Sequence, residues 1–356
     1  MSSMECHANA PLQAYNTFGI AAKAAWLVHV RSADDVIDVL KRDEWRQVPK
    51  WVLGGGSNIV LTGDVDAVVL KVEVAGLGVV DETQSDWIVE AGAGVGWHDF
   101  VRWTLEQGMG GLENMALIPG TVGAAPVQNI GAYGMELQHR FHSLDAVDLQ
   151  SGDRVTLDAE ACAFGYRDSV FKHERTVRAD GIPFGWRNRL VITRVRFALP
   201  KVWRAEVAYQ DLQRKIEATG ISEPTALQVF DWVVDIRTAK LPDPRDIGNA
   251  GSFFKNPTVT PEQCADIIGR DPHVVHYPLG DGRFKLAAGW LIDACGWKGK
   301  KIGAAGVYEK QALVLVNRGT ASHPVTGGEV MTLAKAIQTS VYERFGIWLE
   351  TEPEVI

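Results

Sequence analysis

A hydroxyl group on a glycine-rich turn is the first feature of this sequence that could do chemistry. Ser252 lies in the segment GNAGSFFKNP (248–257), whose glycines allow backbone to approach a ligand closely. Phe253 and Phe254 follow at once and should anchor the turn on an apolar wall. A polar atom held in an apolar frame can present a proton donor, although an ordinary glycine turn would have the same residues.

Two further glycine-rich segments could hold a ligand. GGGSN (54–58) follows a short apolar strand and lacks the spacing of a dinucleotide G-x-G-x-x-G fingerprint. Its consecutive N–H groups could form an anion nest for a pyrophosphate, and the alternative is a plain turn. The stretch IPGTVGAAPVQNIGAYG (118–134) interleaves small, amide and apolar residues with almost no charge. This pattern favours a loop that lines the binding site of a large, flat, partly polar ligand. The alternative is a buried loop with a purely structural role.

Charged residues occur at two places that could complete a site. Arg167 stands beside Tyr166, and Asp168 follows it. An arginine fork binds a carboxylate at two points, and Asp168 could fix the orientation of that fork. A surface salt bridge is the alternative. Glu354 follows a proline near the end of the sequence and, taken alone, would be a solvated residue of the tail.

The elements that position these residues are of mixed type. Apolar periodicity and capping signals predict helices at 32–42, 97–107, 224–240, 287–295 and 326–345, and strands at 51–53, 67–70, 87–90, 143–149, 190–199 and 312–317. Side chains expected to be buried on the first and third of these helices are Val36, Ile37, Leu40, Leu227, Phe230, Val233 and Val234. The segment LPDP (241–244) is the best linker candidate, so we predict an α+β protein with a split near residue 240.

Composition excludes several classes of function. A length of 356 residues predicts two or three lobes, and a formal charge of −8 argues against nucleic-acid binding as the main role. No run of 18 apolar residues could span a membrane, and residues 1–14 lack the apolar stretch of a signal peptide. Four scattered cysteines without a C-x-x-C pair indicate reduced thiols rather than a disulfide frame or a zinc site. A cytoplasmic location is expected.

Together these segments resemble the UDP-N-acetylenolpyruvoylglucosamine reductase family over residues 16–354. The resemblance rests on GGGSN (54–58), GLENMALIPGTVGAAPVQNIGAYG (111–134), GYRDSVFK (165–172), KLPDP (240–244), GNAGSFFKNP (248–257) and EPE (352–354). Tyr209, in AYQDL (208–212), is similar to the tyrosine loop of the type I members. The resemblance departs at the end, where the chain stops two residues after Glu354. Many relatives continue, often with an arginine in place of Ile356.

The resemblance implies an α+β fold with an FAD-binding part of the vanillyl-alcohol-oxidase type and an α+β substrate-binding domain. The expected division is a first FAD-binding subdomain at 1–75, a second at 76–239, and a substrate-binding domain at 240–340. A C-terminal segment at 341–356 would return to the active site and bring Glu354 close to Arg167.

The resemblance also implies which molecules bind. One non-covalent FAD would be held by Gly54, Gly55, Gly56, Ser57, Asn58, Ile118, Pro119, Gly120, Thr121, Gly123, Ala124, Gln128, Asn129, Gly131, Ala132 and Tyr133. A UDP-sugar enolpyruvyl ether would be bound by Tyr166, Tyr209, Lys240, Asn256 and Gln311. NADPH is expected as co-substrate, in the same cleft. No metal is needed, and His98, His139 and His273 show no ligand spacing. No nucleic acid or membrane partner is expected, and the protein should be a monomer.

The implied reaction is the reduction of UDP-N-acetylglucosamine enolpyruvate to UDP-N-acetylmuramate in peptidoglycan precursor synthesis. The reduced flavin would deliver hydride from N5 to C3 of the substrate. Arg167 would stabilise charge that develops on the substrate carboxylate, and Glu354 could hydrogen-bond the enolic form. Ser252 would then donate a proton to C2.

Two other classes of protein remain as alternatives. A flavin-dependent oxidase of the same fold would often tether its flavin through a histidine beside the pyrophosphate turn, and residues 51–54 contain none. A non-catalytic sugar-nucleotide sensor would have no use for the proton donor, so Arg167, Ser252 and Glu354 together argue against it. Flavin absorbance followed by NADPH addition would separate the three.

Overall fold

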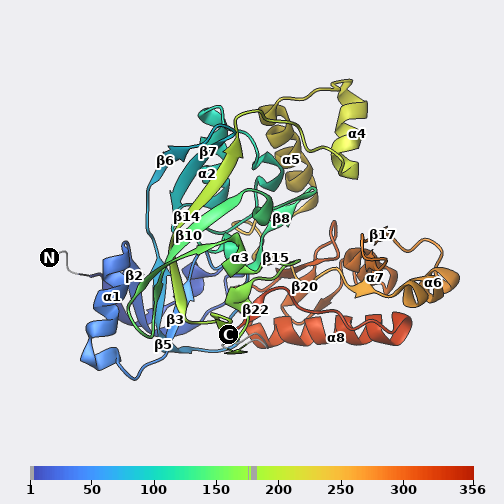
Figure 1. The fold of residues 1–356 in the computed structure, drawn as a ribbon. Coiled ribbons are helices and arrows are strands. Elements are labelled where there is room, and N and C mark those ends of the chain that lie inside the picture. The colour runs from blue at the N-terminus through green and yellow to red at the C-terminus, as the bar shows by residue number, and fades with distance from the viewer. Residues whose placement is uncertain (1–3, 175, 178–182) are drawn as a thin grey trace. The chain divides into compact units, whose positions relative to one another are not determined.

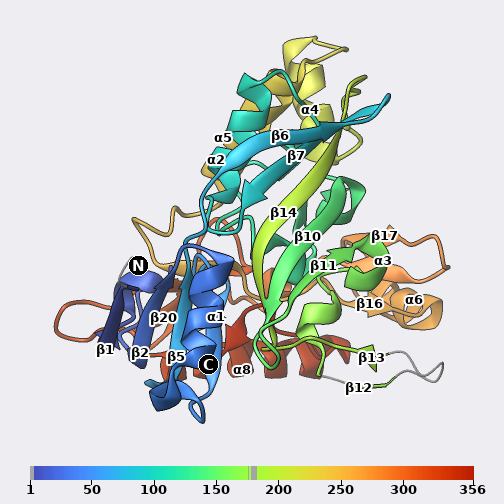
Figure 2. The same cartoon turned by 60° about the vertical axis from the view of Figure 1, so that its left-hand side comes forward.

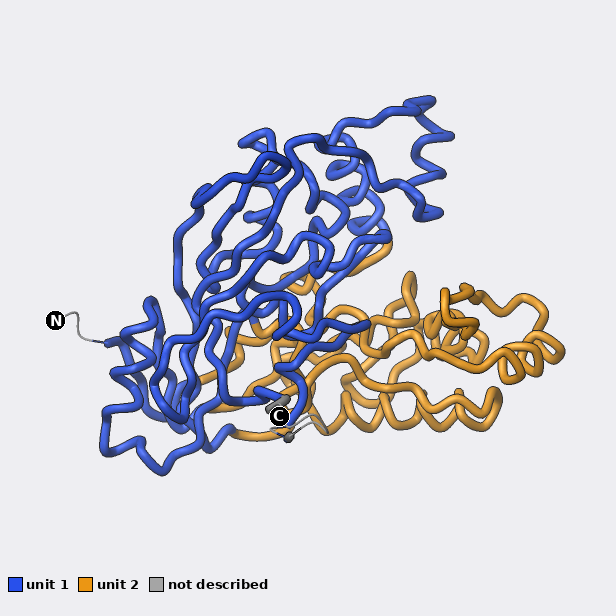
Figure 3. The backbone as a smooth tube through the Cα atoms, in the orientation of Figure 1, with its two compact units in different colours: residues 1–10, 24–55, 65–239 blue, residues 11–23, 56–64, 240–356 orange. Residues whose placement is uncertain are grey.

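The computed structural model describes residues 4–174, 176–177 and 183–356 (Figure 1). The chain forms two compact units, coloured separately in Figure 3. Unit 1 comprises residues 1–10, 24–55 and 65–239, and unit 2 comprises residues 11–23, 56–64 and 240–356. Unit 2 therefore takes two short segments from the first 64 residues, which no pattern in the sequence predicts. The division into flavin-binding and substrate-binding parts stays a prediction, because the units are defined by their contacts alone.

Unit 1 contains two main sheets. The first has the order β1-β2-β5-β3, with β2 parallel to β5 and β5 parallel to β3. The second has the order β11-β10-β14-β7-β6 and is antiparallel throughout (Figure 2). The strands of unit 1 are β1 (Cys6–Pro11), β2 (Lys23–Val30), β3 (Lys50–Leu53), β5 (Val65–Val72), β6 (Leu77–Glu82), β7 (Asp86–Gly92), β8 (Gly131–Ala132), β9 (Met135–Glu136), β10 (Phe141–Asp148), β11 (Arg154–Asp158), β12 (Thr176–Val177), β13 (Pro183–Phe184) and β14 (Leu190–Pro200).

The helices of unit 1 contribute side chains to its hydrophobic core. They are α1 (Ala33–Lys41), α2 (Trp97–Glu106), α3 (Ala159–Cys162), α4 (Gln210–Thr219) and α5 (Ala226–Lys240). On α2, the rings of Trp97 and Phe100 pack on Phe197 of β14, with centroids 5.8 and 5.0 Å away. All three side chains are buried; the Trp97 pair is edge-to-face and the Phe100 pair is tilted, and aromatic pairs of this kind add to the free energy of burial.

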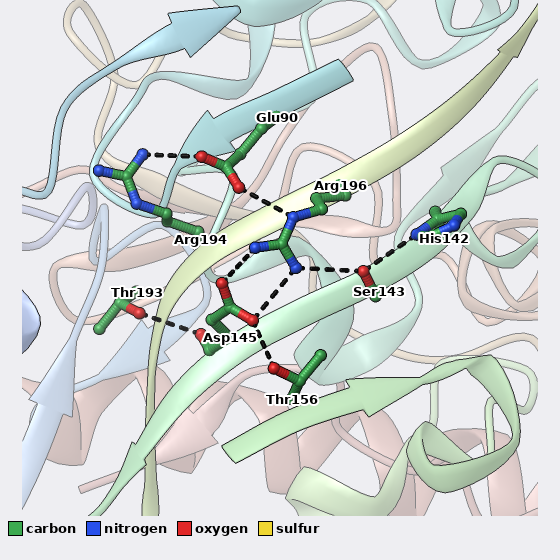
Figure 4. Close-up of polar contacts among 8 residues, drawn as sticks. All are labelled: Glu90, His142, Ser143, Asp145, Thr156, Thr193, Arg194 and Arg196. Atoms are coloured by element: carbon green, nitrogen blue, oxygen red, sulfur yellow. Dashed lines mark hydrogen bonds and ion pairs between the residues drawn. The ribbon is translucent and has the colours of Figure 1, made fainter. Parts of the chain in front are cut away.

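Strand β14 alternates as its sequence predicts, and its polar face carries an ion network (Figure 4). Arg194 and Arg196 both bind Glu90 of β7, at 3.0 and 2.9 Å, and Arg196 also binds Asp145 of β10. Partial burial opposes ionisation of Asp145, but hydrogen bonds from Arg196 and Thr156 lower its pKa below the usual value. The network thus ties three neighbouring strands on the face opposite the buried side chains.

Unit 2 is built on an antiparallel sheet of order β15-β21-β20-β19 and a smaller one of order β16-β18-β17. Its strands are β4 (Ile59–Val60), β15 (Asn249–Ser252), β16 (Thr258–Val259), β17 (His276–Pro278), β18 (Phe284–Leu286), β19 (Lys301–Ile302), β20 (Ala305–Val307), β21 (Val314–Asn317) and β22 (Glu354–Val355), and its helices are α6 (Pro261–Arg270), α7 (Ala288–Ala294) and α8 (Gly327–Phe345). Helix α8 buries Leu333, Ile337 and Val341 and packs on α7, β19 and β20.

The predicted helices and strands are present, but the buried faces of two helices were predicted only in part. On α1, Val36 is buried as expected, Ile37 and Leu40 are half-buried, and Val39 is buried instead; Val234 on α5 is also half-buried. Ser32 caps α1, and Gly346 ends α8 in the left-handed conformation. On α5, Phe230 and Val233 are buried as expected, but Leu227 is 58% exposed. The prediction for Leu227 is wrong because the helix turns Val229, Trp232 and Ile236 toward the core instead.

The capping box of α8 leads to a prediction about stability. Glu329 accepts hydrogen bonds from the backbone of Ala304 and Thr326 and contacts His323, each at 3.0 Å. The Ala304 bond is the main cause that lowers the pKa of Glu329 from 4.5 to about 2. A carboxylate whose pKa is lower in the folded state than in the unfolded state stabilises the fold at pH values above its ordinary pKa. This contribution is lost as the pH falls toward 2.

Glu329→Gln should therefore lower the free energy of unfolding of unit 2 by about 1 kcal/mol at pH 7. The difference from wild type should shrink below pH 4.5 and vanish near pH 2. Denaturant unfolding followed at several pH values measures this. A difference that does not change with pH would mean that the charge of Glu329 contributes nothing.

Candidate functional site

Two of the predicted ligand-binding segments touch each other within unit 1. A Cβ atom added to Gly55 would lie 2.8 Å from the Cα of Gly120, and one on Gly54 would lie 3.0 Å from the hydroxyl of Thr121. The approach at Gly55 is too close for any side chain, so the turn after β3 needs glycine there, whereas at Gly54 a Cβ would fit only if the Thr121 side chain moved. The fold therefore brings the first glycine-rich turn against the 118–134 loop, as expected if both contact one ligand.

Hydrogen-bond donors are left unused where these segments meet. Among the described residues, no acceptor contacts the backbone N–H of Gly55, Gly120 or Thr121. The N–H groups of Gly55 and Gly120 are half-buried, but the hydroxyl of Thr121 is buried and has no partner in the described part of the chain. Buried polar groups are usually paired, so this hydroxyl calls for a partner from outside the protein. A pyrophosphate or another polar edge of FAD fits a glycine turn with free N–H groups.

The rest of the loop is held rigidly. The N–H of Val122 donates to Val95, and the N–H of Gly123 donates to Ala93, both at 2.9 Å. Asn129 is fully buried in a left-handed conformation, and its side-chain amide donates to Glu136 and to the carbonyl of Gly165, both at 3.0 Å. Both amide hydrogens of Asn129 thus serve to position the loop.

Arg167 is fixed to this loop. It follows Gly165 in a tight turn and adopts a φ of +53°, a conformation that is rare for residues other than glycine. Its guanidinium donates to the carbonyl of Gly131 at 2.9 Å and lies 5.6 Å from the ring of Tyr166. Strained backbone of this kind often marks a functional position.

The expectation that Asp168 orients Arg167 is wrong. The carboxylate of Asp168 pairs with His173 at 2.8 Å, and the guanidinium of Arg167 is positioned by Gly131 instead. The turn at residue 167 directs the two neighbouring side chains to different partners.

A second cation lies near Arg167 and was missed by the sequence analysis. Arg237 on α5 donates to the carbonyl of Leu117 at 3.3 Å, and its buried Nε has no partner among the described residues. Burial lowers the pKa of Arg237, Arg167 lowers it further, and Tyr133 opposes them. Two cations close together favour an anionic ligand. An arginine four residues after the buried Val233, on the apolar face of α5, was the signal that could have revealed it.

Aromatic side chains border the same region. Tyr133, at the end of the 118–134 loop, has a φ of +49°, and its ring lies 5.2 Å from that of Tyr209. Burial raises the pKa of Tyr133 to about 12, so its hydroxyl stays a hydrogen-bond donor at neutral pH. Tyr209, predicted to contact the substrate, is 43% exposed and directly precedes α4.

Ser252 lies at the end of β15 in unit 2. Its side chain is exposed, and it follows Gly251, which has a φ of +69°. Phe253 and Phe254 are buried, and their rings lie 5.3 Å apart. The prediction that these aromatics anchor the turn is confirmed.

Glu354 belongs to the same unit and is held through its backbone. Strand β22 runs parallel to β4, and the N–H of Glu354 donates to the carbonyl of Asn58 at 3.0 Å. Ile356 donates to Val60 and accepts from Thr62, at 2.9 and 2.7 Å. The last residues are thus joined to the segment that follows the first glycine turn.

The other predicted substrate contacts also lie in unit 2. Lys240 is the last residue of α5 and the first residue of the 240–356 segment of unit 2, and it is exposed. Asn256 accepts from the N–H of Ala288 at the start of α7, and Gln311 accepts from the N–H of Leu313. The structure therefore places Tyr166, Arg167 and Tyr209 in unit 1, and Lys240, Ser252, Asn256, Gln311 and Glu354 in unit 2.

Comparison with known families agrees with these observations. Residues 24–158 match the model of an FAD-binding domain, and residues 243–356 match the C-terminal domain of UDP-N-acetylenolpyruvoylglucosamine reductase. The chain is 55% identical to the reductase of that name from Paraburkholderia xenovorans, over 96% of this chain and 95% of the relative. It is 54% identical to the one from Azoarcus sp., over 97% and 96%.

Solved structures show the same fold. The reductase from Thermus caldophilus matches 99% of this chain and 98% of its own, with a TM-score of 0.62 and 22% identity. The 6-hydroxy-D-nicotine oxidase from Arthrobacter nicotinovorans matches 98% and 87%, with a TM-score of 0.50 and 13% identity. The predicted α+β fold of the vanillyl-alcohol-oxidase type is thereby confirmed. The chain is an FAD-dependent oxidoreductase and belongs to the UDP-N-acetylenolpyruvoylglucosamine reductase family.

Proposed function

We propose that this enzyme reduces UDP-N-acetylglucosamine enolpyruvate to UDP-N-acetylmuramate, with NADPH as electron donor, in peptidoglycan precursor synthesis. The observation that carries the proposal is the contact between Arg167 and Gly131. This contact fixes a guanidinium against the loop that would hold FAD, where it can meet a carboxylate presented to the flavin.

The substrate class sets what the protein must supply. An enol ether conjugated to a carboxylate accepts hydride at C3, because charge can flow into the carboxylate. Bound FAD, once reduced by NADPH, would supply that hydride from its N5 atom. Arg167 would stabilise the charge that develops on the carboxylate, through two parallel hydrogen bonds.

The reduced substrate also needs a proton at C2, and Ser252 is the proposed donor. Its hydroxyl is exposed, and the buried Phe253 and Phe254 hold its backbone. A serine is a weak acid, but a carbanion-like carbon is a strong base, so the transfer is downhill. Glu354 would hydrogen-bond the enolic form.

The UDP moiety needs cationic and hydroxyl partners. Lys240 and Tyr209 are exposed side chains of these types, and we assign them, with Asn256, to the nucleotide diphosphate. Gln311 and Tyr166 are proposed as further substrate contacts. The Asn256 carbonyl oxygen binds Ala288, so its amide group would face the ligand as a donor.

Substrate-dependent oxidation of NADPH tests the proposed function. The purified flavoprotein should be bleached by NADPH under anaerobic conditions and should regain its colour when the enolpyruvyl substrate is added. Recovery with oxygen alone, at a comparable rate, would instead indicate an oxidase. A protein that is not bleached by NADPH would contradict the assignment of the electron donor.

Flavin attachment gives a second prediction. FAD should bind non-covalently to residues 54–58 and 118–134, because no covalent tether is expected in the turn after β3. Denaturation should release all of the flavin into the supernatant. Flavin that remains with the precipitated protein would show a covalent bond.

The unpaired hydroxyl of Thr121 gives a third prediction. Thr121→Val keeps the side-chain shape and should weaken FAD binding about tenfold, the effect of one lost hydrogen bond. The apoprotein should be as stable as wild type or slightly more so, since an unsatisfied buried group is removed.

A matched control is Thr104→Val on α2. The hydroxyl of Thr104 is also buried, but it donates to Val101 at 2.8 Å. This variant should lose stability without a specific loss of FAD affinity. Equal effects of the two variants on flavin binding, measured by fluorescence titration, would contradict a contact between Thr121 and FAD.

A cytoplasmic location fits the proposed co-substrate and the state of the cysteines. Cys6, Cys162, Cys264 and Cys295 are all free thiols. Burial raises the pKa of Cys162 to about 12, so this thiol stays protonated and unreactive. Among the described residues, every helix is too short or too polar to cross a bilayer. A monomer remains the prediction for the oligomeric state.

A further inference from the structure

Three side chains that could bind a metal ion gather at the β1 edge of the four-stranded sheet of unit 1. They are Glu5, His7 and His29, and their ligand atoms all lie within 4.8 Å of one another. Glu5 directly precedes β1 and His7 is its second residue, so the two side chains, two positions apart in extended backbone, lie on the same side. His29 lies on the neighbouring β2, and its N–H donates to the carbonyl of Glu5 at 3.0 Å.

The spacing is close to that of a tetrahedral site. The Nε2 of His7 lies 3.3 Å from the Oε1 of Glu5, and the Nε2 of His29 lies 3.9 Å from the same oxygen. Bonds of about 2.0–2.1 Å in tetrahedral geometry place neighbouring ligand atoms roughly 3.3 Å apart. The side chains of His7 and Glu5 are 56% and 43% exposed, so they can close the remaining distance without repacking the core.

His29 is close to the orientation of a ligand. Its ring is 8% exposed, and its Nδ1 lies 3.0 Å from the Oε1 of Glu73, which directly follows β5. This contact is within ion-pair distance but is not aligned as a hydrogen bond, and a carboxylate so close to one ring nitrogen can support a metal-binding histidine after a small rotation of its ring. The Nε2 atom is the one that faces Glu5.

The charges of the cluster favour a cation. Arg31 binds the Oε2 of Glu5 at 2.6 Å and lies 3.4 Å from Glu73, so it leaves the Oε1 of Glu5 facing the histidines. The two carboxylates of Glu5 and Glu73 face the one guanidinium of Arg31, so the charged groups beside the histidines are net negative.

We propose that Glu5, His7 and His29 bind one divalent transition-metal ion of the zinc type, with water as the fourth ligand. Two imidazoles and one carboxylate form a donor set that suits Zn²⁺. The ion would tie the edge strand β1 to β2 and so protect the exposed edge of the four-stranded sheet. We assign the ion no part in the proposed reduction.

The test is a calorimetric titration of tag-free, FAD-loaded, chelator-treated protein with Zn²⁺. Wild type should bind one equivalent, and Co²⁺ at the same site should give the visible absorption of a four-coordinate ion, beyond the flavin bands. His7→Gln and Glu5→Gln should each weaken Zn²⁺ binding tenfold or more. Glu73→Gln, which loses only the support of His29, should weaken it by roughly tenfold.

His273→Gln is the matched control, because His273 is an exposed histidine of unit 2. It should leave zinc affinity unchanged, and all four variants should keep wild-type flavin content. Absence of a stoichiometric binding event in wild type would overturn the proposal. Unchanged affinity in His7→Gln would overturn it as well, since the ion would then be bound elsewhere.

Discussion

Replacing Ser252 by alanine should slow reoxidation of the reduced enzyme by the enolpyruvyl substrate by ~10²-fold or more, about 3 kcal/mol in barrier. Reduction of the flavin by NADPH should be almost unchanged, because that step needs no proton on carbon. The substitution should not disturb the fold, since Ser252 is exposed and its hydroxyl makes no hydrogen bond among the described residues. Rapid mixing of each half-reaction measures both rates.

A second substitution at the same position, Ser252→Cys, tests whether the acidity of the side chain matters. Ser252→Cys has a similar size and a more acidic group, so it should recover part of the lost rate. If both half-reactions slow equally in the alanine variant, Ser252 shapes the site and does not donate the proton. If cysteine is no better than alanine, the acidity of the group at this position is irrelevant.

Arg167→Lys should lower turnover with the enolpyruvyl substrate by about 10²-fold or more, with little change in flavin content. Lysine keeps the charge but loses the planar fork that can hold Gly131 and a carboxylate at once. The positive φ at residue 167 is equally unfavourable for arginine and lysine, because both carry a Cβ, so the substitution should not change the backbone strain. Steady-state kinetics with NADPH oxidation as the readout, together with flavin absorbance, measure the two effects.

The control for this variant is Arg154→Lys on β11. Arg154 is exposed and pairs with Asp34, so the substitution should leave turnover within about twofold of wild type. Near-normal turnover of Arg167→Lys would mean that a positive charge is sufficient, and that two-point binding is not used. Loss of flavin from Arg167→Lys would mean that the contact with Gly131 supports the cofactor loop.

The sequence alone determined the local structure and the family. Helix caps at Ser32 and Thr326 and the alternation along β14 depend on residues two to four positions apart, so periodicity reveals them. The glycine-rich segments could be recognised because close backbone approach excludes side chains. The structure explains this requirement at Gly55, which leaves no room for a Cβ against Gly120.

Only the tertiary structure decided which of these segments meet. Asp168 pairs with His173 instead of Arg167, and Leu227 is exposed. In both cases the sequence pattern allows more than one orientation of the side chain, and contacts with neighbouring elements determine which one is adopted. Arg237 joins the site from a helix 70 residues beyond Arg167, and the pairing of β1 with β2 brings His29 to Glu5. Such contacts depend on the packing of distant segments, whose free energy is not encoded in any short window of sequence.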